Sequence, residues 1–464
     1  MGNSQLIERE HGLQRGLSTA QMTMIGLGGA IGTGLFMGSG IAIGYAGPAV
    51  LVSYVIAAYI AMVMVFSLSE MAVVHPTAGS FGVYAEMYLG PWAGFLVRYT
   101  YWMAQVVAIG GEAVAAGLYM SYWLPEVPVW IWSVSFAGIL VYINSLSVAN
   151  FGSFEYWCTL IKVTAIVLFI AFGIAHIFGL GAPATGFDNL VNLPGGFMPN
   201  GLGGVWMGVL IAVFSFYGIE IVAVTSGEAV DPRTSIPRAL RTMALRLLLF
   251  YVLALGIMVT VLPWTEAGAT AVQQSPFVRI FEHAGIRHAA GIMNFVVLTA
   301  ALSSMNTNLY LTSRMLFSLA RGGYAPAALG RLGDKGTPVI AAVVSGSCIL
   351  LTASVSKLTP YAYNYLLGIA LFGGLTIWTF ILLSHLRFRQ RHGKIALPVR
   401  MPLFPYAQLS AIALLAAILL TMAFDREFWN VAWIVGVPWL AGISAAYFIW
   451  KKAQEARALA ATEQ

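Results

Sequence analysis

The sequence predicts an all-α polytopic membrane protein, and three observations lead to that fold class. Of its 464 residues, 59% are hydrophobic and only 9% are charged, whereas ordinary globular chains carry about a quarter charged residues. The mean hydropathy of the whole chain is +0.81. About twelve apolar stretches are long enough to cross roughly 30 Å of hydrocarbon as helices. This composition excludes a soluble enzyme, a disordered scaffold and a nucleic-acid-binding protein.

The predicted spans are apolar runs that end at charged residues, prolines and glycines. Their approximate bounds are 17–45, 47–74, 91–123, 127–148, 153–180, 203–229, 236–262, 289–320, 337–356, 360–387, 403–424 and 429–450. The third and eighth are long enough to tilt strongly. A short polar stretch from His75 to Gly90 separates the second span from the third, and it predicts an interfacial or re-entrant helix.

The basic residues predict the orientation of the chain. With the N-terminus placed inside, 18 of the 24 lysines and arginines lie on the cytoplasmic side and four on the opposite side, while Arg98 and Lys162 fall within spans. The positive-inside rule therefore predicts a multi-pass protein of the cytoplasmic (inner) membrane, with residues 1–16 and 451–464 as cytoplasmic tails. The excess of basic residues, which gives the net charge of +6, then marks the cytoplasmic side and faces anionic lipid.

The first span contains five glycines between Gly26 and Gly34. Because a glycine inside a helix costs about 1 kcal/mol relative to alanine, this run predicts a local break in the helix. Inside a bilayer, unpaired backbone groups are tolerated only where they line a cavity or are buried in protein. The alternative is close helix packing through small residues, and the spacing of Gly34 and Gly38 fits that alternative equally well.

The sixth span carries a second predicted interruption, in Phe214-Ser-Phe-Tyr-Gly-Ile-Glu220, where Gly218 lies two residues before a mid-span Glu220. A broken helix exposes N–H groups at one end and carbonyl groups at the other, which complement a carboxylate and an ammonium group. The two interrupted spans begin two sets of five, residues 17–180 and 203–387. An odd number of crossings inverts the second set, so we expect a 5+5 inverted repeat followed by two peripheral helices at 403–450.

Ionisable residues inside the predicted spans are few, and each is a functional candidate because burial of a charge in a membrane is costly. Lys162, about 14 Å into the fifth span at 1.5 Å per residue, could bind and release a proton, or it could be a strut against broken-helix carbonyls. Glu112, on the same face of the third span as Gln105, could carry a proton or form a structural ion pair. We expect Glu220 to stabilise unwound backbone rather than to contact substrate.

The eighth span carries a polar stripe at helical spacing. This stripe predicts either a lined pathway or hydrogen bonding between helices, and it consists of Ser303, Asn306, Thr307, Tyr310 and Arg314.

Three other acids, Glu70, Glu155 and Glu228, lie near the inner ends of predicted spans, where we expect them to cap helices or to form a cytoplasmic gate. No histidines or cysteines have the spacing of metal ligands, and no catalytic constellation is present. The sequence therefore predicts neither a metal, a cofactor nor an enzyme.

Several motifs together resemble the amino acid–polyamine–organocation superfamily, and in particular its bacterial amino acid permease branch. The resemblance covers nearly the whole chain and rests on Gly28-Gly-Ala-Ile-Gly-Thr-Gly-Leu-Phe36, Gly47-Pro48, Glu70-x5-Pro76, Gly79-Ser-Phe81, Gly195-Gly-Phe-Met-Pro-Asn200, Phe214-Ser-Phe-Tyr-Gly-Ile-Glu220, Gly227-Glu228, Asp231-Pro232 and Ser313-Arg-Met-Leu-Phe317. It implies a five-plus-five core and proton-coupled uptake of an amino acid.

The resemblance also implies residue roles. The backbone at Gly32, Thr33 and Gly34 would receive the substrate carboxylate, and carbonyls near Ala30, Phe214 and Tyr217 would receive the α-ammonium group. Phe214 would also act as an aromatic gate, and Lys162 would replace a sodium ion by a proton cycle.

From these features we expect a symporter for a neutral amino acid, driven by the proton gradient, with the amino acid, the proton and membrane lipid as its partners. The neutral substrate follows from the lack of a further acid aimed at a cationic side chain, apart from Glu112 and Glu220. The alternatives are an amino acid exchanger, a γ-aminobutyrate-type permease and, from other classes, a membrane-embedded enzyme or a nutrient sensor.

Overall fold

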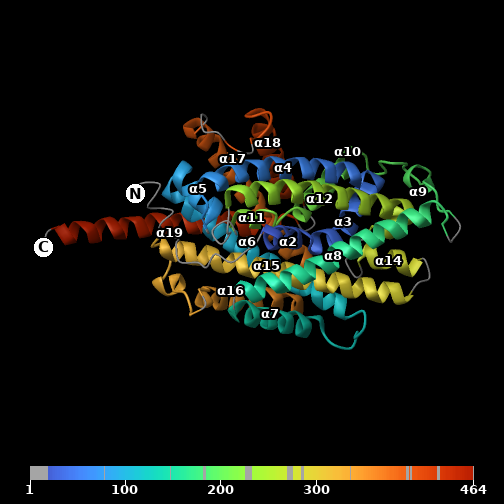
Figure 1. Cartoon of the computed structure of the whole chain (residues 1–464), viewed down its shortest axis with the longest axis horizontal. Helices are drawn as coiled ribbons and strands as arrows, with labels where there is room; N and C mark the ends of the chain where they lie inside the picture. Colours follow the sequence, from blue (N-terminus) through green and yellow to red (C-terminus); the bar gives the residue numbers. More distant parts are fainter. Residues whose placement is uncertain are drawn as a thin grey trace.

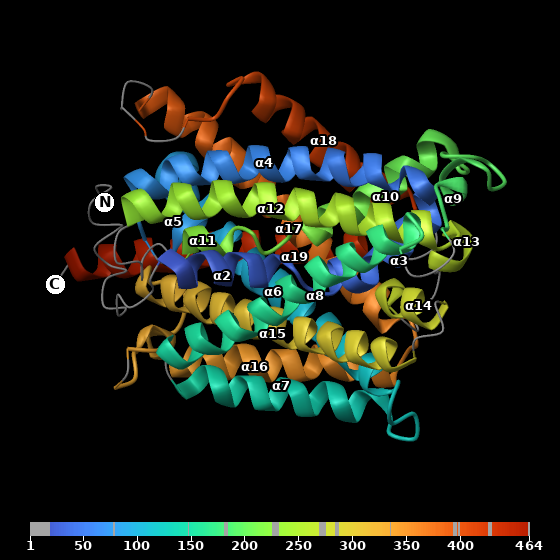
Figure 2. The same cartoon turned by 45° about the vertical axis from the view of Figure 1, so that its right-hand side comes forward.

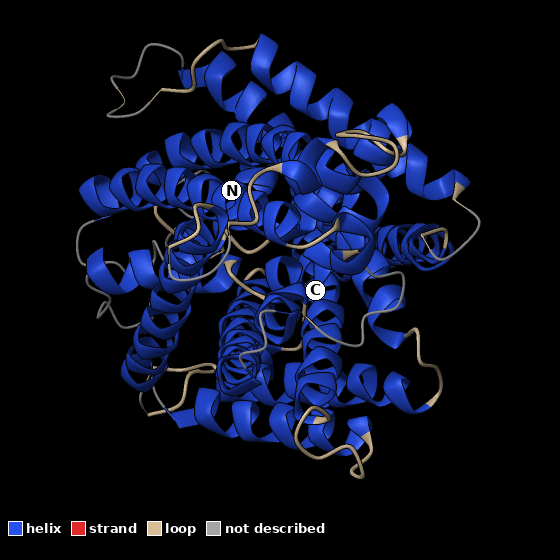
Figure 3. Cartoon of the chain, turned by 90° about the vertical axis from the view of Figure 1, so that its right-hand side faces the viewer, coloured by secondary structure: helices blue, strands red, loops and turns tan. Residues whose placement is uncertain are grey.

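The described part of the chain folds into one bundle of helices, most of them aligned with the long axis of the molecule (Figure 1). The structure is a computed structural model that describes residues 19–77, 79–146, 148–180, 184–224, 232–268, 275–283, 287–334, 336–392, 397, 400–425 and 429–462. Within these ranges every regular element is a helix, as the end-on view in Figure 3 shows.

The helices of the first half are α2 (Thr19–Ala30), η1 (Gly34–Gly38), α3 (Ser39–Ala46), η2 (Gly47–Ala49), α4 (Val50–Val74), α5 (Ser80–Leu89), α6 (Pro91–Met120), α7 (Val129–Leu146) and α8 (Val148–Ile177). Those that follow are α9 (Asp188–Val191), α10 (Gly201–Ser215), α11 (Ile221–Val224), α12 (Pro232–Val261), α13 (Trp264–Ala267), α14 (Pro276–His283), α15 (Arg287–Arg321), η4 (Ala327–Gly330), α16 (Val339–Ala353), η5 (Ser354–Lys357), α17 (Ala362–His392), α18 (Tyr406–Phe424) and α19 (Val431–Thr462).

Each predicted span falls on a helix or on a pair of helices. Eight described stretches are long and apolar enough to cross a membrane, and the first of them, Thr23–Val74, covers two predicted spans. Three shorter apolar helices, Val129–Asn144, Gly201–Ser215 and Leu248–Val261, overlap three further spans. The end of the predicted sixth span, including Glu228, lies outside the described residues.

The first and sixth spans are both interrupted. After α2 ends at Ala30, the N–H of Gly32 bonds to the Ala30 carbonyl at 3.1 Å instead of continuing the four-residue pattern. The chain then forms a π-helix, η1, a type of turn that often occurs at functional sites. In the sixth span, α10 ends at Ser215 and α11 begins at Ile221, with Gly218 between them at φ +102°.

Two segments show features that the sequence did not predict. The stretch from His75 to Gly90 contains a short helix, α5, as expected, and Ser80 to Tyr88 are all buried because α5 packs between α6 and α17. Its Glu86 pairs with the fully buried Arg98 of α6 at 2.9 Å. The last helix, α19, continues to Thr462 through the segment expected to be a tail. It projects from the end of the bundle opposite α9, α13 and α14 (Figures 1 and 2).

A buried polar cluster joins α18 to the rest of the bundle. The Glu70 carboxylate of α4 contacts His385 Nε2 of α17 at 2.8 Å and accepts the Met401 N–H at 2.5 Å. The other ring nitrogen of His385 lies 2.6 Å from Gln408 Nε2 on α18. Glu70, His385 and Gln408 are all buried, so three helices share one set of polar contacts.

Candidate functional site

The two interrupted helices meet at the centre of the bundle, where glycines allow their backbones to approach. A β-carbon added to Gly34 would lie 2.8 Å from Cα of Ser215, at the end of α10. One added to Gly218 would lie 2.7 Å from the Gly29 carbonyl oxygen of α2. A β-carbon added to Gly38 would lie 3.2 Å from a methyl of Ile211 on α10. The glycines of the first span therefore lie at the interruption of the helix and also allow the two helices to pack closely.

A tyrosine of the continuous helix α12 connects the two breaks. The Tyr251 hydroxyl lies 2.9 Å from the Ala30 carbonyl oxygen and 2.6 Å from the Ser215 carbonyl oxygen, and it can donate to either. Tyr54 of α4 contacts the hydroxyl of Ser215 at 2.9 Å. Helix-terminal carbonyls lack a partner from the next turn of their own helix, so Tyr251 joins the ends of α2 and α10, while Tyr54 contacts only the end of α10.

A small cavity lies at this junction. Backbone from the first break, two aromatic rings from the second and polar side chains of α6 and α15 line it; the lining residues are Gly29, Ala30, Gly32, Gly34, Ala108, Glu112, Phe214, Tyr217, Ser304 and Asn308. Its free volume is about 10 Å³, which is space for roughly one water molecule. An amino acid can enter only if the lining side chains or helix segments move.

The structure brings together six of the predicted site residues in this lining. They are Ala30, Gly32, Gly34, Phe214, Tyr217 and Glu112. The lining does not include Thr33, Gly218, Lys162, Glu220, Gln105, Ser303 or Asn306. Thr33 is buried beside the break, and its carbonyl accepts a 3.5 Å bond from the Tyr363 hydroxyl. Gln105 is fully buried on α6.

Glu112 is the acidic group of the cavity wall. Its carboxylate accepts a 2.5 Å bond from the Ser304 hydroxyl and a 3.5 Å bond from the amide of Asn308. A β-carbon added to Gly32 would lie 3.1 Å from Glu112 Oε1 and 2.7 Å from Ser304 Oγ. Gly32 thus leaves the space that these two polar side chains need next to the first break.

Lys162 lies beside the break, behind the cavity wall. The side chain is fully buried, and Nζ donates to the Gly28 carbonyl at 2.6 Å, the Ile31 carbonyl at 3.1 Å and the Ser303 hydroxyl at 2.9 Å. Its ammonium group therefore stabilises carbonyls on both sides of the end of α2. Both interpretations of Lys162, the strut and the proton carrier, are compatible with these contacts.

Glu220 supports the second break. One carboxylate oxygen accepts the backbone N–H of Gly218 at 3.1 Å, and the other accepts the Tyr101 hydroxyl at 3.2 Å. The side chain is fully buried and is directed at the backbone of its own turn, as its position beside the interruption suggested.

None of the five residues of the polar stripe on α15 belongs to the lining of the cavity. Ser303 contacts Lys162, and Asn306 accepts a 2.7 Å bond from the amide of Asn144 on α7. Thr307 packs its methyl against Gly29, and Arg314 lies 3.5 Å above the ring of Tyr310 on the same helix. These contacts lie within and between helices, and the lined pathway stays a prediction.

Sequence reasoning missed four residues of the cavity lining, Gly29, Ala108, Ser304 and Asn308. The available signal was the i, i+4 spacing of Ser304 and Asn308, which places both on one face of α15. That face lies about 100° from the one that carries Ser303, and only packing against α6 shows which of the two faces the cavity.

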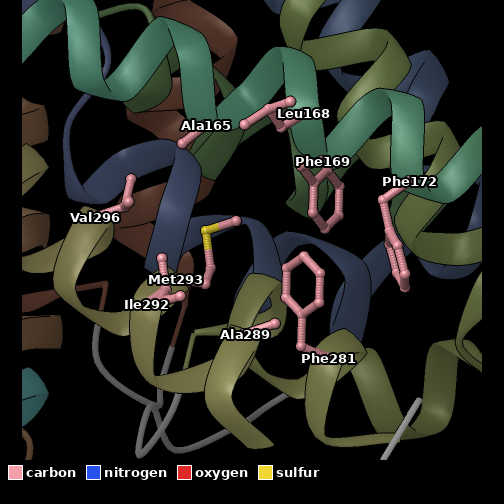
Figure 4. Close-up of a pocket in the computed structure, with 9 residues that line it drawn as sticks. All are labelled: Ala165, Leu168, Phe169, Phe172, Phe281, Ala289, Ile292, Met293 and Val296. Atoms are coloured by element: carbon pink, nitrogen blue, oxygen red, sulfur yellow. The ribbon is translucent and has the colours of Figure 1, made fainter. Parts of the chain in front are cut away.

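A larger pocket, of about 230 Å³, lies between α8, α14 and α15 (Figure 4). All nine lining side chains are apolar; they are Ala165, Leu168, Phe169, Phe172, Phe281, Ala289, Ile292, Met293 and Val296. Buried charged groups require charged or hydrogen-bonding partners. This pocket has no such side chain for a carboxylate or an ammonium group, so the smaller cavity is the candidate site for an amino acid.

An all-helical membrane protein with two interrupted helices that meet at a buried polar cavity has the construction of a secondary transporter. Comparison with known proteins agrees: residues 21–460 match the family described as "Amino acid permease". The chain belongs to this family, and it is an amino acid transporter rather than an enzyme.

Three relatives illustrate the similarity. The chain is 41% identical over 443 residues to "Uncharacterized amino acid permease YtnA" of Bacillus subtilis (strain 168), covering 94% of this chain and 95% of that protein. It is 39% identical over 452 residues to "Gamma-aminobutyric acid permease" of the same organism, with 96% and 95% covered. It is 37% identical over 454 residues to "Aromatic amino acid transport protein AroP" of Escherichia coli (strain K12), with 97% and 98% covered.

Proposed function

We propose that this chain takes up a neutral amino acid together with a proton by alternating access. The observation that carries the proposal is the cavity at the meeting point of the two breaks, because its wall combines backbone from the first break with aromatic rings from the second. Broken helices at the membrane midplane form the binding sites of many secondary transporters.

In the proposed binding mode, the substrate carboxylate lies against the backbone of Gly32, Thr33 and Gly34, and its ammonium group lies against carbonyls near Ala30, Phe214 and Tyr217. The location of Gly32, Gly34 and Phe214 in the cavity wall supports this arrangement. Gly218 permits the backbone conformation of the second break, because its φ of +102° is one that residues with a side chain rarely adopt. The Phe214 ring would then move to admit the substrate.

Proton coupling is assigned to Lys162. Its contacts with the Gly28 and Ile31 carbonyls make the conformation of the first break depend on the protonation of the amine. Loss of a proton would leave one fewer donor for these carbonyls, which favours movement of α2. Glu112, in the cavity wall, would sense whether the substrate is present.

The proposed topology places both termini in the cytoplasm. Residues 17–180 and 203–387 would form the two inverted repeats, and residues 403–450 the two peripheral helices. The charge distribution supports this orientation, and Figure 2 shows α2 on the side of the bundle from which α19 projects.

The neutral substrate is supported by the geometry of the acids. Glu220 is directed at backbone, and both oxygens of Glu112 accept bonds from α15. The alternatives within transport are an exchanger and a γ-aminobutyrate-type permease, and the second is favoured by the 39% identity to a protein of that name.

Uptake by proteoliposomes under an inward proton gradient tests the proposal. The panel consists of labelled alanine, leucine, phenylalanine and γ-aminobutyrate, followed by competition with each common amino acid. We expect accumulation of a neutral α-amino acid and a rise in external pH. Equal uptake without a gradient, with strict dependence on internal amino acid, would show an exchanger instead.

The matched variant is Lys162→Ala. We expect it to abolish gradient-driven accumulation, because the proton carrier is lost, and to retain part of the exchange of labelled for unlabelled substrate. Full accumulation by Lys162→Ala under the same pH gradient would refute the assignment of proton coupling to this lysine.

A further inference from the structure

Glu155 is a buried carboxylate that the proposed mechanism has not used. Its position near a predicted inner span end suggested a cap or a gate, but α8 begins at Val148, so Glu155 lies about two turns inside the helix. Its side chain is fully buried. It lies seven residues before Lys162 and therefore on the same face of α8, which explains why the two side chains meet.

A serine hydroxyl connects the two charged groups. Lys162 Nζ donates to Ser303 Oγ at 2.9 Å, and Ser303 Oγ in turn donates to Glu155 Oε1. The direct separation from Lys162 Nζ to Glu155 Oε1 is 3.9 Å. The hydroxyl thus accepts from the ammonium group and donates to the carboxylate, which is the order that proton transfer between them requires.

The remaining contacts of Glu155 are neutral. Thr159 Oγ1 lies 3.3 Å from Oε1 and also bonds to the Met24 carbonyl, and the Asn306 amide lies 3.5 Å from Oε2. Among the described residues, the titratable groups that interact with Glu155 are Lys162 and Cys158 of α8 and Glu112 of α6. The sides facing α2 and α15 carry backbone, hydroxyl and amide groups.

We propose that Glu155 receives the proton of Lys162, through Ser303, before its release to the cytoplasm. This proposal rests on the proposed proton coupling. In the transfer an N–H bond of the ammonium group breaks and its proton joins Ser303 Oγ, while the former hydroxyl proton forms the O–H bond of the Glu155 carboxyl group. The products are a neutral amine, an unchanged serine and a neutral acid, so no unpaired charge is left buried.

Gly28 couples this transfer to the substrate site. Its carbonyl accepts the 2.6 Å bond from Lys162, and a β-carbon added to it would lie 2.1 Å from Glu155 Oε1. Both groups therefore touch the same residue of α2, only a few residues before the break that lines the cavity. Movement of α2 changes the contacts of the amine and of the acid together.

The experiment compares Glu155→Gln with wild type in proteoliposomes, using the labelled amino acid of the panel that wild type accumulates best. We expect Glu155→Gln to lose gradient-driven accumulation and the associated proton influx, and to retain exchange at equal pH, because the cavity and Lys162 are intact. Glu155→Asp should accumulate substrate with a shifted pH profile. Ser303→Ala should behave like Glu155→Gln, and Ser303→Thr, which keeps the hydroxyl, should restore coupling.

Glu86→Gln is the control, because Glu86 is also a buried acid paired with a cation but lies on α5, outside this network. It should lower the melting temperature without changing the ratio of accumulation to exchange. Normal accumulation with an unchanged pH profile in Glu155→Gln would overturn the relay, and so would parallel loss of accumulation and exchange. If wild type itself shows no proton coupling, the proposed function fails first and the relay fails with it.

Discussion

At the scale of single residues, the site depends on groups that satisfy the ends of broken helices. Lys162 contacts two carbonyls around the first break, Glu220 accepts an N–H within the second, and Tyr251 reaches both. A buried carbonyl that loses its partner costs about 1–3 kcal/mol. These three side chains therefore stabilise a geometry that the backbone alone would not keep.

Tyr251→Phe tests this account. The change removes the hydroxyl that lies 2.9 Å from the Ala30 carbonyl and 2.6 Å from the Ser215 carbonyl. We expect the apparent affinity for the transported amino acid to fall about tenfold, the equivalent of about 1.4 kcal/mol, together with a lower melting temperature.

The matched control is Tyr59→Phe, since the Tyr59 hydroxyl bonds to Ser410 at the outer side of α4. Uptake kinetics and thermal unfolding should be close to wild type in this variant. Equal effects of the two substitutions would contradict a specific role of Tyr251 at the junction.

At the scale of elements, both interruptions were predictable because their causes are local. Five glycines within nine residues weaken any helix, and a glycine beside a mid-span acid marks the second break. The choice of polar face on α15 was not predictable in the same way. Ser303 and Ser304 are neighbours in sequence, yet one contacts Lys162 and the other Glu112, and this difference is decided by the packing of α15 against α6 and α8.

Gly34→Val examines the contact between the two interrupted helices. A β-carbon at Gly34 would lie 2.8 Å from Cα of Ser215, and backbone cannot yield as a flexible side chain can. We expect loss of binding of the transported amino acid to purified protein, measured by titration. Gly138→Val in α7 is the control, because a β-carbon there meets nothing within 4 Å. Unchanged affinity in Gly34→Val would count against a substrate site at the first break.

At the scale of the whole molecule, the helix order followed from hydropathy, whereas burial within the bundle did not. The predicted span ranges match the helices, but α5 is buried and α8 begins five residues earlier than expected, which places Glu155 in the interior. Tertiary contacts determine both outcomes. An apolar sequence does not distinguish a helix that faces lipid from one that faces protein, because both surroundings are apolar.

The orientation can be measured with single cysteines in a chain whose own Cys158 and Cys348 are replaced. Because the basic residues concentrate on one side, we expect a membrane-impermeant maleimide to label Glu282→Cys, near the end of α14, in intact cells. Lys452→Cys, in α19, should react only after permeabilisation. Both positions are exposed. The reverse pattern would place the termini outside.

The cluster around Glu70 bears on whether the last two helices are dispensable. A chain cut after α17 would keep the Glu70 carboxylate and the His385 ring but would lose the Met401 N–H and the Gln408 amide that contact them. Arg389 of α17 would also remain, 3.3 Å from Glu70, but the loss of a hydrogen bond to a buried polar group costs about 1–3 kcal/mol. We therefore expect a chain cut after α17 to unfold at a lower temperature than the full-length carrier, so α18 contributes to the stability of the helices that precede it.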